Sequence, residues 1–209
     1  MYMLYIFDEV GKLSDDFHIR LAPYLSQERI EKIGRIKSSS QKGLSAAVYA
    51  LLRYALAVKY GIDEPVLFDY GKNEKPRLKD FPYIHFNLSH TASAVACALS
   101  DSPIGVDVQR ISNVSDKVAE RVLTKQEFKE FLQTENQDEY FCRLWTIKES
   151  LLKQTGQGIA AEFREMSADG FSDITVYKGD DYYCCITKAN AAIEKVSFDN
   201  LINREENHV

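Results

Sequence analysis

The segment SSSQKGLSAAVYALLRYALAVKYG, residues 38–61, restricts the fold more than any other part of the sequence. Serines stand at its start, Gly61 is suited to end a helix, and apolar residues recur between them at helical spacing. That spacing is carried by Leu44, Val48, Leu51, Leu52 and Ala55. Strand patterns flank the segment at residues 2–7 and 66–70, so the chain combines a long helix with a sheet.

Strands and helices follow one another in a similar order in both halves of the chain. In the first half we expect helices near 15–23 and 26–36 and a turn-rich loop over 71–82. Strands are expected at 84–88, 93–99 and 104–109, in meander spacing. In the second half, Thr124 and Glu127 form a capping-box pair, and a helix is expected over about 138–154. The strand segments DITVYK, YYCCIT and IEKVSF follow it.

This order predicts an α+β fold with two similar, pseudo-symmetric lobes, each a small, mainly antiparallel sheet packed with helices. We place residues 1–104 in an N-terminal lobe and residues 105–209 in a C-terminal lobe. Each lobe then has the size of an ordinary small domain. No fixed-period repeat is visible, which excludes a solenoid.

Cysteine usage and hydropathy indicate the compartment. The chain lacks an apolar run of about 18 residues, and its N-terminus turns acidic before a signal-peptide core can form. Its four cysteines, Cys97, Cys142, Cys184 and Cys185, have no C-x-x-C spacing, so we expect reduced thiols. We therefore expect a cytoplasmic protein without membrane contact.

Charge is distributed unevenly along the chain. The net charge is −5, from 26 Lys+Arg and 31 Asp+Glu, yet basic residues gather in two clusters that flank one segment of the first half. They are Arg29, Lys32, Arg35, Lys37, Lys42, Arg53 and Lys59, and then Lys72, Lys75, Arg77 and Lys79. Each cluster alone is explained by solvated helix faces, but together they suggest a site for a small polyanion. The span is too short for a nucleic-acid groove, so no nucleic-acid partner is expected.

The predicted strand IGVDVQ, residues 104–109, carries two oxygen donors on one face. Strand periodicity puts the apolar Ile104, Val106 and Val108 on one face. Asp107 and Gln109 then present a carboxylate and a carboxamide on the other. Such hard donors suit Mg²⁺, which binds one or two carboxylates and completes its shell with water and phosphate. An ordinary strand with one solvent face is the alternative.

Trp145, Glu149 and Lys153 in LWTIKESLLK share one stripe of the predicted helix, because they are spaced i, i+4 and i+8. An exposed Glu–Lys pair, worth about 0.2–0.5 kcal/mol, is one explanation. The other is a further oxygen donor followed by an ammonium group, which suits phosphoryl chemistry.

A third segment, EKPRL followed by HFNLSHT, supplies phosphate contacts by residue type. Lys75 precedes a proline in an extended loop, and Asn87, Ser89 and His90 end a strand. A hydrogen-bonded structural role is the alternative for each. Because Ser89 and His90 are adjacent on an extended backbone, their side chains point to opposite faces, which disfavours a serine hydrolase.

The order and spacing of these segments resemble the two-lobed, surfactin-synthetase-activating type of 4′-phosphopantetheinyl transferase. The resemblance rests on Lys75-Pro76, FNLSH at 86–90, IGVDV at 104–108 and WTIKES at 145–150 with Lys153, and it runs from about Leu25 to Ile159. Residues 160–209 carry no motif that contributes to it. The resemblance implies a monomeric enzyme that moves the phosphopantetheine arm of coenzyme A to a serine of an apo acyl or peptidyl carrier protein, releasing 3′,5′-ADP.

The resemblance also implies roles for individual residues. Asp107 and Glu149 would hold Mg²⁺ and Glu149 could accept the serine proton, while Lys153 would stabilise charge on the transferring phosphate. Ser89, His90 and Lys75 would contact coenzyme A phosphates, with Arg29 and Lys32 at the 3′-phosphate. Gln109 departs from the commonest pattern, which has an acidic residue there, so it is a weaker metal ligand.

The stretch VAERVLTKQEFKEFLQ resembles the part of the family that faces the carrier, although its apolar residues also fit the core face of two helices. Two other functions fit the residues themselves. A Mg²⁺-dependent nucleotide phosphohydrolase would use the same ligands without a carrier, and a non-catalytic coenzyme-A-binding protein would retain the site without its chemistry.

Overall fold

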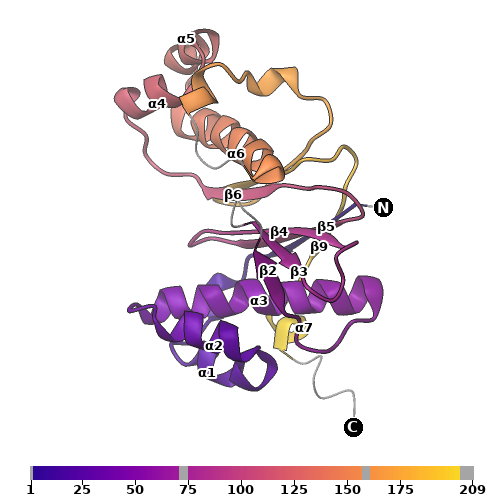
Figure 1. Cartoon of the computed structure of the whole chain (residues 1–209). Coiled ribbons are helices and arrows are strands. Elements are labelled where there is room, and N and C mark those ends of the chain that lie inside the picture. The colour runs from indigo at the N-terminus through magenta and orange to yellow at the C-terminus, as the bar shows by residue number, and fades with distance from the viewer. Residues whose placement is uncertain (1, 71–74, 157–160, 203–209) are drawn as a thin grey trace.

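The computed structural model describes residues 2–70, 75–156 and 161–202, and its main elements form four stacked layers (Figure 1). A long helix, α3 (Ser39–Tyr60), covers a sheet of four strands in the order β4-β5-β1-β9. A second sheet, in the order β6-β8-β7, lies on the other face of the first, and helix α6 (Gln137–Thr155) covers it. The chain is therefore a mixed α+β protein with small sheets.

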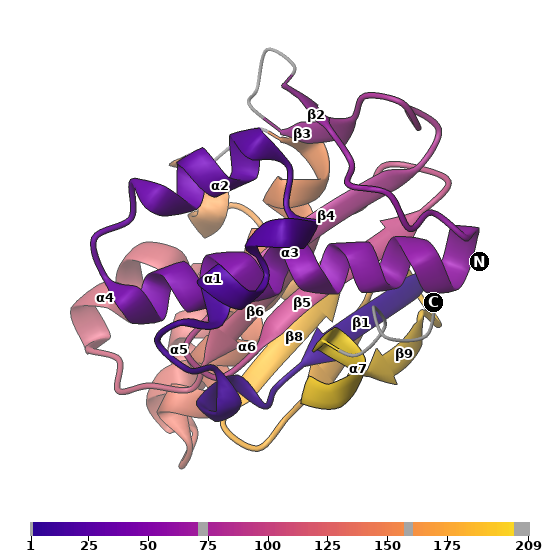
Figure 2. The same ribbon diagram turned by 90° about the horizontal axis from the view of Figure 1, so that it is seen from below.

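The strands of the first sheet are β1 (Met3–Phe7), β4 (His85–His90), β5 (Val95–Ser100) and β9 (Ala192–Lys195), and those of the second are β6 (Val106–Arg110), β7 (Thr175–Lys178) and β8 (Tyr182–Ile186). A separate hairpin consists of β2 (Phe68–Tyr70) and β3 (Pro76–Leu78). The shorter helices are α1 (Phe17–Arg20), α2 (Gln27–Gly34), α4 (Asp116–Val122), α5 (Lys125–Gln133) and α7 (Phe198–Ile202). Seen from below, α3 lies across the strands, with α2 beside the β2–β3 hairpin (Figure 2).

The predicted long helix is confirmed as α3. Gly61 adopts a left-handed conformation at φ 69° and ends it, as its lack of a Cβ allows. The helix buries its apolar stripe against the face of β5 formed by Val95, Cys97 and Leu99. The opposite face of β5 carries Ala94, Ala96 and Ala98, which pack against the second sheet. The small alanines let the two sheets approach each other closely, and both faces of β5 are buried.

Strand β6 departs from the expected meander. Strands β4 and β5 pair in antiparallel fashion as expected, but β6 leaves their sheet and pairs with β8. The turn-rich loop expected over 71–82 also contains β3, which pairs with β2 from Pro76 onward. A proline is tolerated at the first residue of a short strand because no ladder hydrogen bond is lost inside it.

The end of the chain returns to the first sheet. Strand β9 pairs in parallel with β1, from Met3 opposite Ala192 to Ile6 opposite Lys195. Helix α7 then packs on α3 in the core below that sheet. Strand β9 and helix α7, both from the segment 105–209, therefore pack with elements of the segment 1–104. Of the helices in the described part of the chain, none is both long enough and apolar enough to cross a membrane.

Gly105 allows α6 to lie directly on the start of β6. A Cβ at this position would lie 1.9 Å from the carbonyl oxygen of Ser150 and 2.6 Å from the amide nitrogen of Gln154, both in α6. The backbone of Gly105 is also held by Thr187, whose hydroxyl accepts from its amide at 2.8 Å. This close packing and the Thr187 hydrogen bond together fix the position of α6 relative to the start of β6.

We expect Gly105→Ala to lower the free energy of unfolding by about 1–3 kcal/mol, the usual cost of overpacking. Thermal unfolding followed by circular dichroism measures it. Gly34→Ala is the matched control, because a Cβ at Gly34 meets no atom of the described residues within 4 Å. Equal melting temperatures for the two variants would contradict the close approach of α6.

Candidate active site

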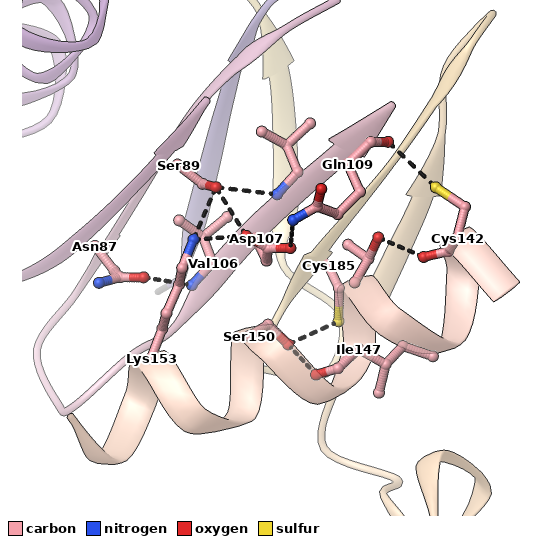
Figure 3. A network of polar contacts seen from close by, with 12 residues as sticks. Asn87, Ser89, Val106, Asp107, Gln109, Cys142, Ile147, Ser150, Lys153 and Cys185 are labelled. Carbon is pink, nitrogen blue, oxygen red and sulfur yellow. Dashed lines mark hydrogen bonds and ion pairs between the residues drawn. The ribbon is translucent and has the colours of Figure 1, made fainter. Parts of the chain in front are cut away.

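Asp107 lies at the centre of a polar cluster between the two sheets and α6 (Figure 3). Its side chain is 1% exposed. Oδ1 accepts hydrogen bonds from the Ser89 hydroxyl at 2.9 Å and from the Lys153 ammonium at 2.5 Å. Oδ2 accepts from the Gln109 amide nitrogen at 2.8 Å. The carboxylate is thus oriented by residues of β4, β6 and α6, and its charge is offset by Lys153.

Side chains from the first half bond the free edge of β6. The Asn87 side-chain oxygen accepts from the Val106 amide at 2.8 Å, and the Ser89 hydroxyl accepts from the Val108 amide at 3.2 Å. Asn87 and Ser89 point to the same face of β4 because they are two residues apart. We call these two side chains the β4 bridge. It replaces the backbone pairing that β6 would have had in the expected meander, and it places Asp107 between its two bonds.

Glu149 contributes a second carboxylate from the turn of α6 before Lys153. It is 9% exposed, and its Oε1 has no hydrogen-bond partner among the residues that the structure describes. Burial raises the pKa of Glu149, the charge of Asp107 raises it further, and Lys153 opposes both. A buried carboxylate oxygen without a donor, close to a second carboxylate, is suited to accept a cation.

The donor set fits Mg²⁺. The described residues contain no group of three or more His, Cys, Asp or Glu side chains placed to hold a metal. Asp107 and Glu149 supply two carboxylates, and Gln109 supplies an amide whose nitrogen is engaged by Asp107. Two carboxylates are what Mg²⁺ usually takes from a protein, with water and substrate phosphates in the remaining positions.

Ser89, Lys75 and His90, the residues expected to contact coenzyme A phosphates, differ in burial and in hydrogen-bond partners. Ser89 is buried and holds Asp107 and β6. The Lys75 ammonium donates to main-chain carbonyl oxygens. His90 ends β4 and is exposed at the surface. Partial loss of hydration lowers the pKa of the His90 imidazole, and the positive charge of Lys153 lowers it further.

Arg29 and Lys32 lie on α2, next to aromatic rings. The Arg29 guanidinium sits 5.4 Å from the Tyr49 ring centroid and 5.1 Å from that of Phe68. The Lys32 ammonium is 5.8 Å from the Tyr70 ring centroid and is exposed. These rings hold the two cations beside the β2–β3 hairpin, apart from the Asp107 cluster.

Two pockets are lined by residues that belong to the Asp107 cluster or are adjacent to it in the sequence. One, of about 370 Å³, is lined by Gln109, Cys142, Trp145 and the exposed Val118, among others. The other, of about 790 Å³, is lined by Lys75, Arg77, His85, Phe86 and Gln154, among others. Both are within the usual range of ligand pockets. The sequence pattern did not indicate His85, which becomes apparent only through its place on the same face of β4 as Asn87.

Lys148, next to Glu149 in the sequence, points into the core. Its ammonium donates to Glu127 at 2.6 Å and to the carbonyl oxygens of Val122 and Phe163. The side chain is fully buried, and that of Glu127 is 3% exposed. The Glu127 carboxylate also accepts hydrogen bonds from the backbone amides of Thr124 and Ala168. The bond from Thr124 confirms the predicted capping box. The pair joins α5 to α6.

The stretch expected to face a carrier forms α4 and α5. Most of its apolar residues are core residues, as the alternative explanation holds: Ala119, Val122, Leu123 and Phe131 are buried against α6 and the second sheet. Val118 and Leu132 remain exposed, at 45% and 51%.

Comparisons with known proteins agree with the geometry. Residues 103–197 match the model of the 4′-phosphopantetheinyl transferase superfamily, which extends the similarity beyond Ile159 into the final strands. The chain is 29% identical over 181 residues to 4′-phosphopantetheinyl transferase Sfp of Bacillus subtilis (strain 168), covering 84% of this chain and 81% of that protein. With 4′-phosphopantetheinyl transferase ffp of Bacillus subtilis the identity is 32% over 151 residues, covering 71% of this chain and 67% of the relative. With 4′-phosphopantetheinyl transferase gsp of Aneurinibacillus migulanus it is 39% over 110 residues, covering 51% and 45%.

Proposed function

Because this chain belongs to the 4′-phosphopantetheinyl transferase superfamily and is an enzyme of that class, we propose that it modifies a serine of an apo acyl or peptidyl carrier protein. The donor is coenzyme A, the reaction requires Mg²⁺, and the second product is 3′,5′-ADP. The observation that carries this proposal is the pair of buried carboxylates, Asp107 and Glu149, with the ammonium of Lys153 beside them. One oxygen of Glu149 has no hydrogen-bond partner in the described part of the chain.

Asp107, Glu149 and the side-chain oxygen of Gln109 are the residues that would hold the metal. When bound, Mg²⁺ supplies Lewis-acid polarisation of the pyrophosphate and a template for in-line displacement. The serine oxygen forms a bond to the phosphorus that carries the pantetheine arm, and the pyrophosphate bond to 3′,5′-ADP breaks. Glu149 accepts the serine proton, directly or through a water molecule, because no donor among the described residues occupies its Oε1. Lys153 offsets charge on the transferring group.

Anion-binding groups on the first half would take the phosphates of coenzyme A. His90 is exposed at the end of β4, and Arg29 and Lys32 project from α2 beside the hairpin. A chain with its own Asp107, Glu149, Ser89 and Lys153 in one cluster needs no second copy, so we propose a monomer. Each sheet is covered by one long helix, and the two sheets face each other in the middle of the molecule (Figure 1). This arrangement supports the proposed pseudo-symmetric, two-lobed organisation. The four free cysteines support a cytoplasmic location.

Intact-mass measurement tests the proposal. An apo carrier protein incubated with the enzyme, coenzyme A and Mg²⁺ should gain the mass of one phosphopantetheine group, with 3′,5′-ADP formed only when the carrier is present. Release of 3′,5′-ADP without any carrier would instead support a phosphohydrolase. If a panel of carriers from fatty-acid, polyketide and peptide synthases gains no mass, the result would favour a non-catalytic coenzyme-A-binding protein.

Gln109→Glu should bind Mg²⁺ more tightly and be less stable without it. The Gln109 amide now donates to Asp107 at 2.8 Å, whereas a carboxylate there would add a charge of the same sign. Titration calorimetry with Mg²⁺ and thermal unfolding in a chelator measure the two effects. Gln109→Met, which neither donates nor adds charge, separates loss of the hydrogen bond from gain of the charge. An unchanged Mg²⁺ affinity in Gln109→Glu would argue against Gln109 as a ligand position.

A further inference from the structure

Lys75 lies where the two halves of the chain meet, and its ammonium group is fully engaged. Nζ donates to the carbonyl oxygens of Lys153 at 2.8 Å, Ile104 at 2.9 Å and Gln154 at 3.0 Å. A lysine ammonium has three hydrogens to donate. All three therefore have main-chain acceptors, and none is left for a phosphate oxygen.

Two of the three acceptors lie in α6, and the third lies just before β6. Lys153 and Gln154 are in the last turn of α6, whose final carbonyl groups have no partners within the helix. Ile104 lies immediately before Gly105, on which α6 rests. A cation at the carboxyl end of a helix also interacts favourably with the helix dipole. Lys75 thus joins the end of the catalytic helix to the start of the strand that carries Asp107.

We propose that Lys75 is a positioning residue for the transfer reaction: by holding the backbone of Lys153 against the start of β6, it sets the Lys153 ammonium on Asp107 and Ser89. This inference rests on the proposed function and replaces the expected contact between Lys75 and a coenzyme A phosphate. The Lys153 ammonium reaches Asp107 Oδ1 at 2.5 Å and Ser89 at 2.9 Å from a backbone whose carbonyl Lys75 binds directly.

The position of Lys75 in the sequence gives the contact a further consequence. It immediately precedes β3, so the hairpin beside Arg29 and Lys32 is connected to the end of α6 by one side chain. The Lys75 ammonium is partly buried against α6, whereas the side chain of Arg77, in β3, is exposed. Displacement of a reacting group by about 1 Å can cost about 10²-fold in rate.

Steady-state kinetics of two charge-removing variants separates positioning from phosphate binding. In Lys75→Met we expect kcat to fall by about 10- to 100-fold, with the coenzyme A KM changed by less than about twofold. Arg77→Met removes the same charge from the same hairpin without touching α6, so any effect should appear in KM. Lys75→Arg keeps a cation and donors, and should recover part of kcat. A raised KM with unchanged kcat in Lys75→Met would overturn the proposal.

A measurement on the wild-type chain makes the test independent of how the variants fold. The Lys75 side-chain nitrogen resonance of ¹⁵N-lysine-labelled enzyme, assigned by its loss in Lys75→Arg, should keep its position when coenzyme A is added. A shift of that resonance on adding coenzyme A would show that Nζ leaves the carbonyl groups for the ligand, and would also overturn the proposal. If wild-type enzyme modifies no carrier, the proposed function fails instead, whatever the resonance does.

Discussion

Replacing Glu149 by Gln, or Asp107 by Asn, is expected to lower the rate of phosphopantetheine transfer by about 10²–10³-fold or more, the cost of losing one electrostatic contact to a developing charge. Both substitutions keep the shape of the side chain and remove a negative charge from the site. Carrier modification followed by mass spectrometry measures the rate. Glu64→Gln, which removes a carboxylate from an exposed loop position, is the control and should leave the rate unchanged.

The two variants should differ in thermal stability. Burial and the charge of Asp107 raise the pKa of Glu149, so its ionised form costs folding free energy above the pKa of an unfolded glutamate. Glu149→Gln should therefore melt at the same temperature as the wild type or higher. Asp107→Asn leaves Lys153 without its 2.5 Å carboxylate partner and should melt at a lower temperature than the wild type.

A wild-type transfer rate in Glu149→Gln or in Asp107→Asn would contradict the assignment of the carboxylate that was replaced.

Lys148→Met is expected to lower the free energy of unfolding by about 3–5 kcal/mol, because it leaves Glu127 as an unpaired buried charge. Two carbonyl oxygens, those of Val122 and Phe163, lose their donor as well. Denaturant unfolding measures the change. The double variant Lys148→Met with Glu127→Gln removes the stranded charge, so it should regain part of the lost stability.

A double variant as unstable as the single one would contradict a cost dominated by the unpaired charge. Lys129→Met in α5 is a matched lysine control, because the Lys129 side chain is exposed. It should unfold close to the wild type. We therefore expect the Lys148–Glu127 pair to affect stability, whereas the neighbouring Glu149 is proposed to act in the reaction.

Local patterns predicted the elements that depend on neighbouring residues. The helix ending at Gly61, the capping box of Thr124 and Glu127, and the shared face of Asp107 and Gln109 all follow from spacings of a few residues. The pairing of β9 with β1 has no such signal, because the two strands lie at opposite ends of the chain. The sequence therefore did not predict that the last strand joins the sheet of the first.

The site was predicted as a set of residues, not as a set of contacts. Residue type identified Ser89 and Lys75 as phosphate partners, because hydroxyl and ammonium groups bind phosphates in many proteins. In the structure Ser89 bonds the side chains of Asp107 and Lys153 and a backbone amide of β6. Lys75 donates to main-chain carbonyl oxygens in α6 and just before β6, and only the folded chain brings these groups within reach. The inward direction of Lys148 was hidden in the same way: α6 is covered on two sides, so charged residues one position apart face different surroundings.

The β4 bridge has a consequence for how the protein avoids association with other chains. In the described part of the chain, β6 is the outer strand of its sheet, and outer strands offer unpaired backbone groups to any passing strand. Asn87 and Ser89 occupy two of those groups, on the Val106 and Val108 amides. The residues that orient Asp107 therefore also close the edge beside it, and activity and protection from aggregation would be lost together if they were replaced.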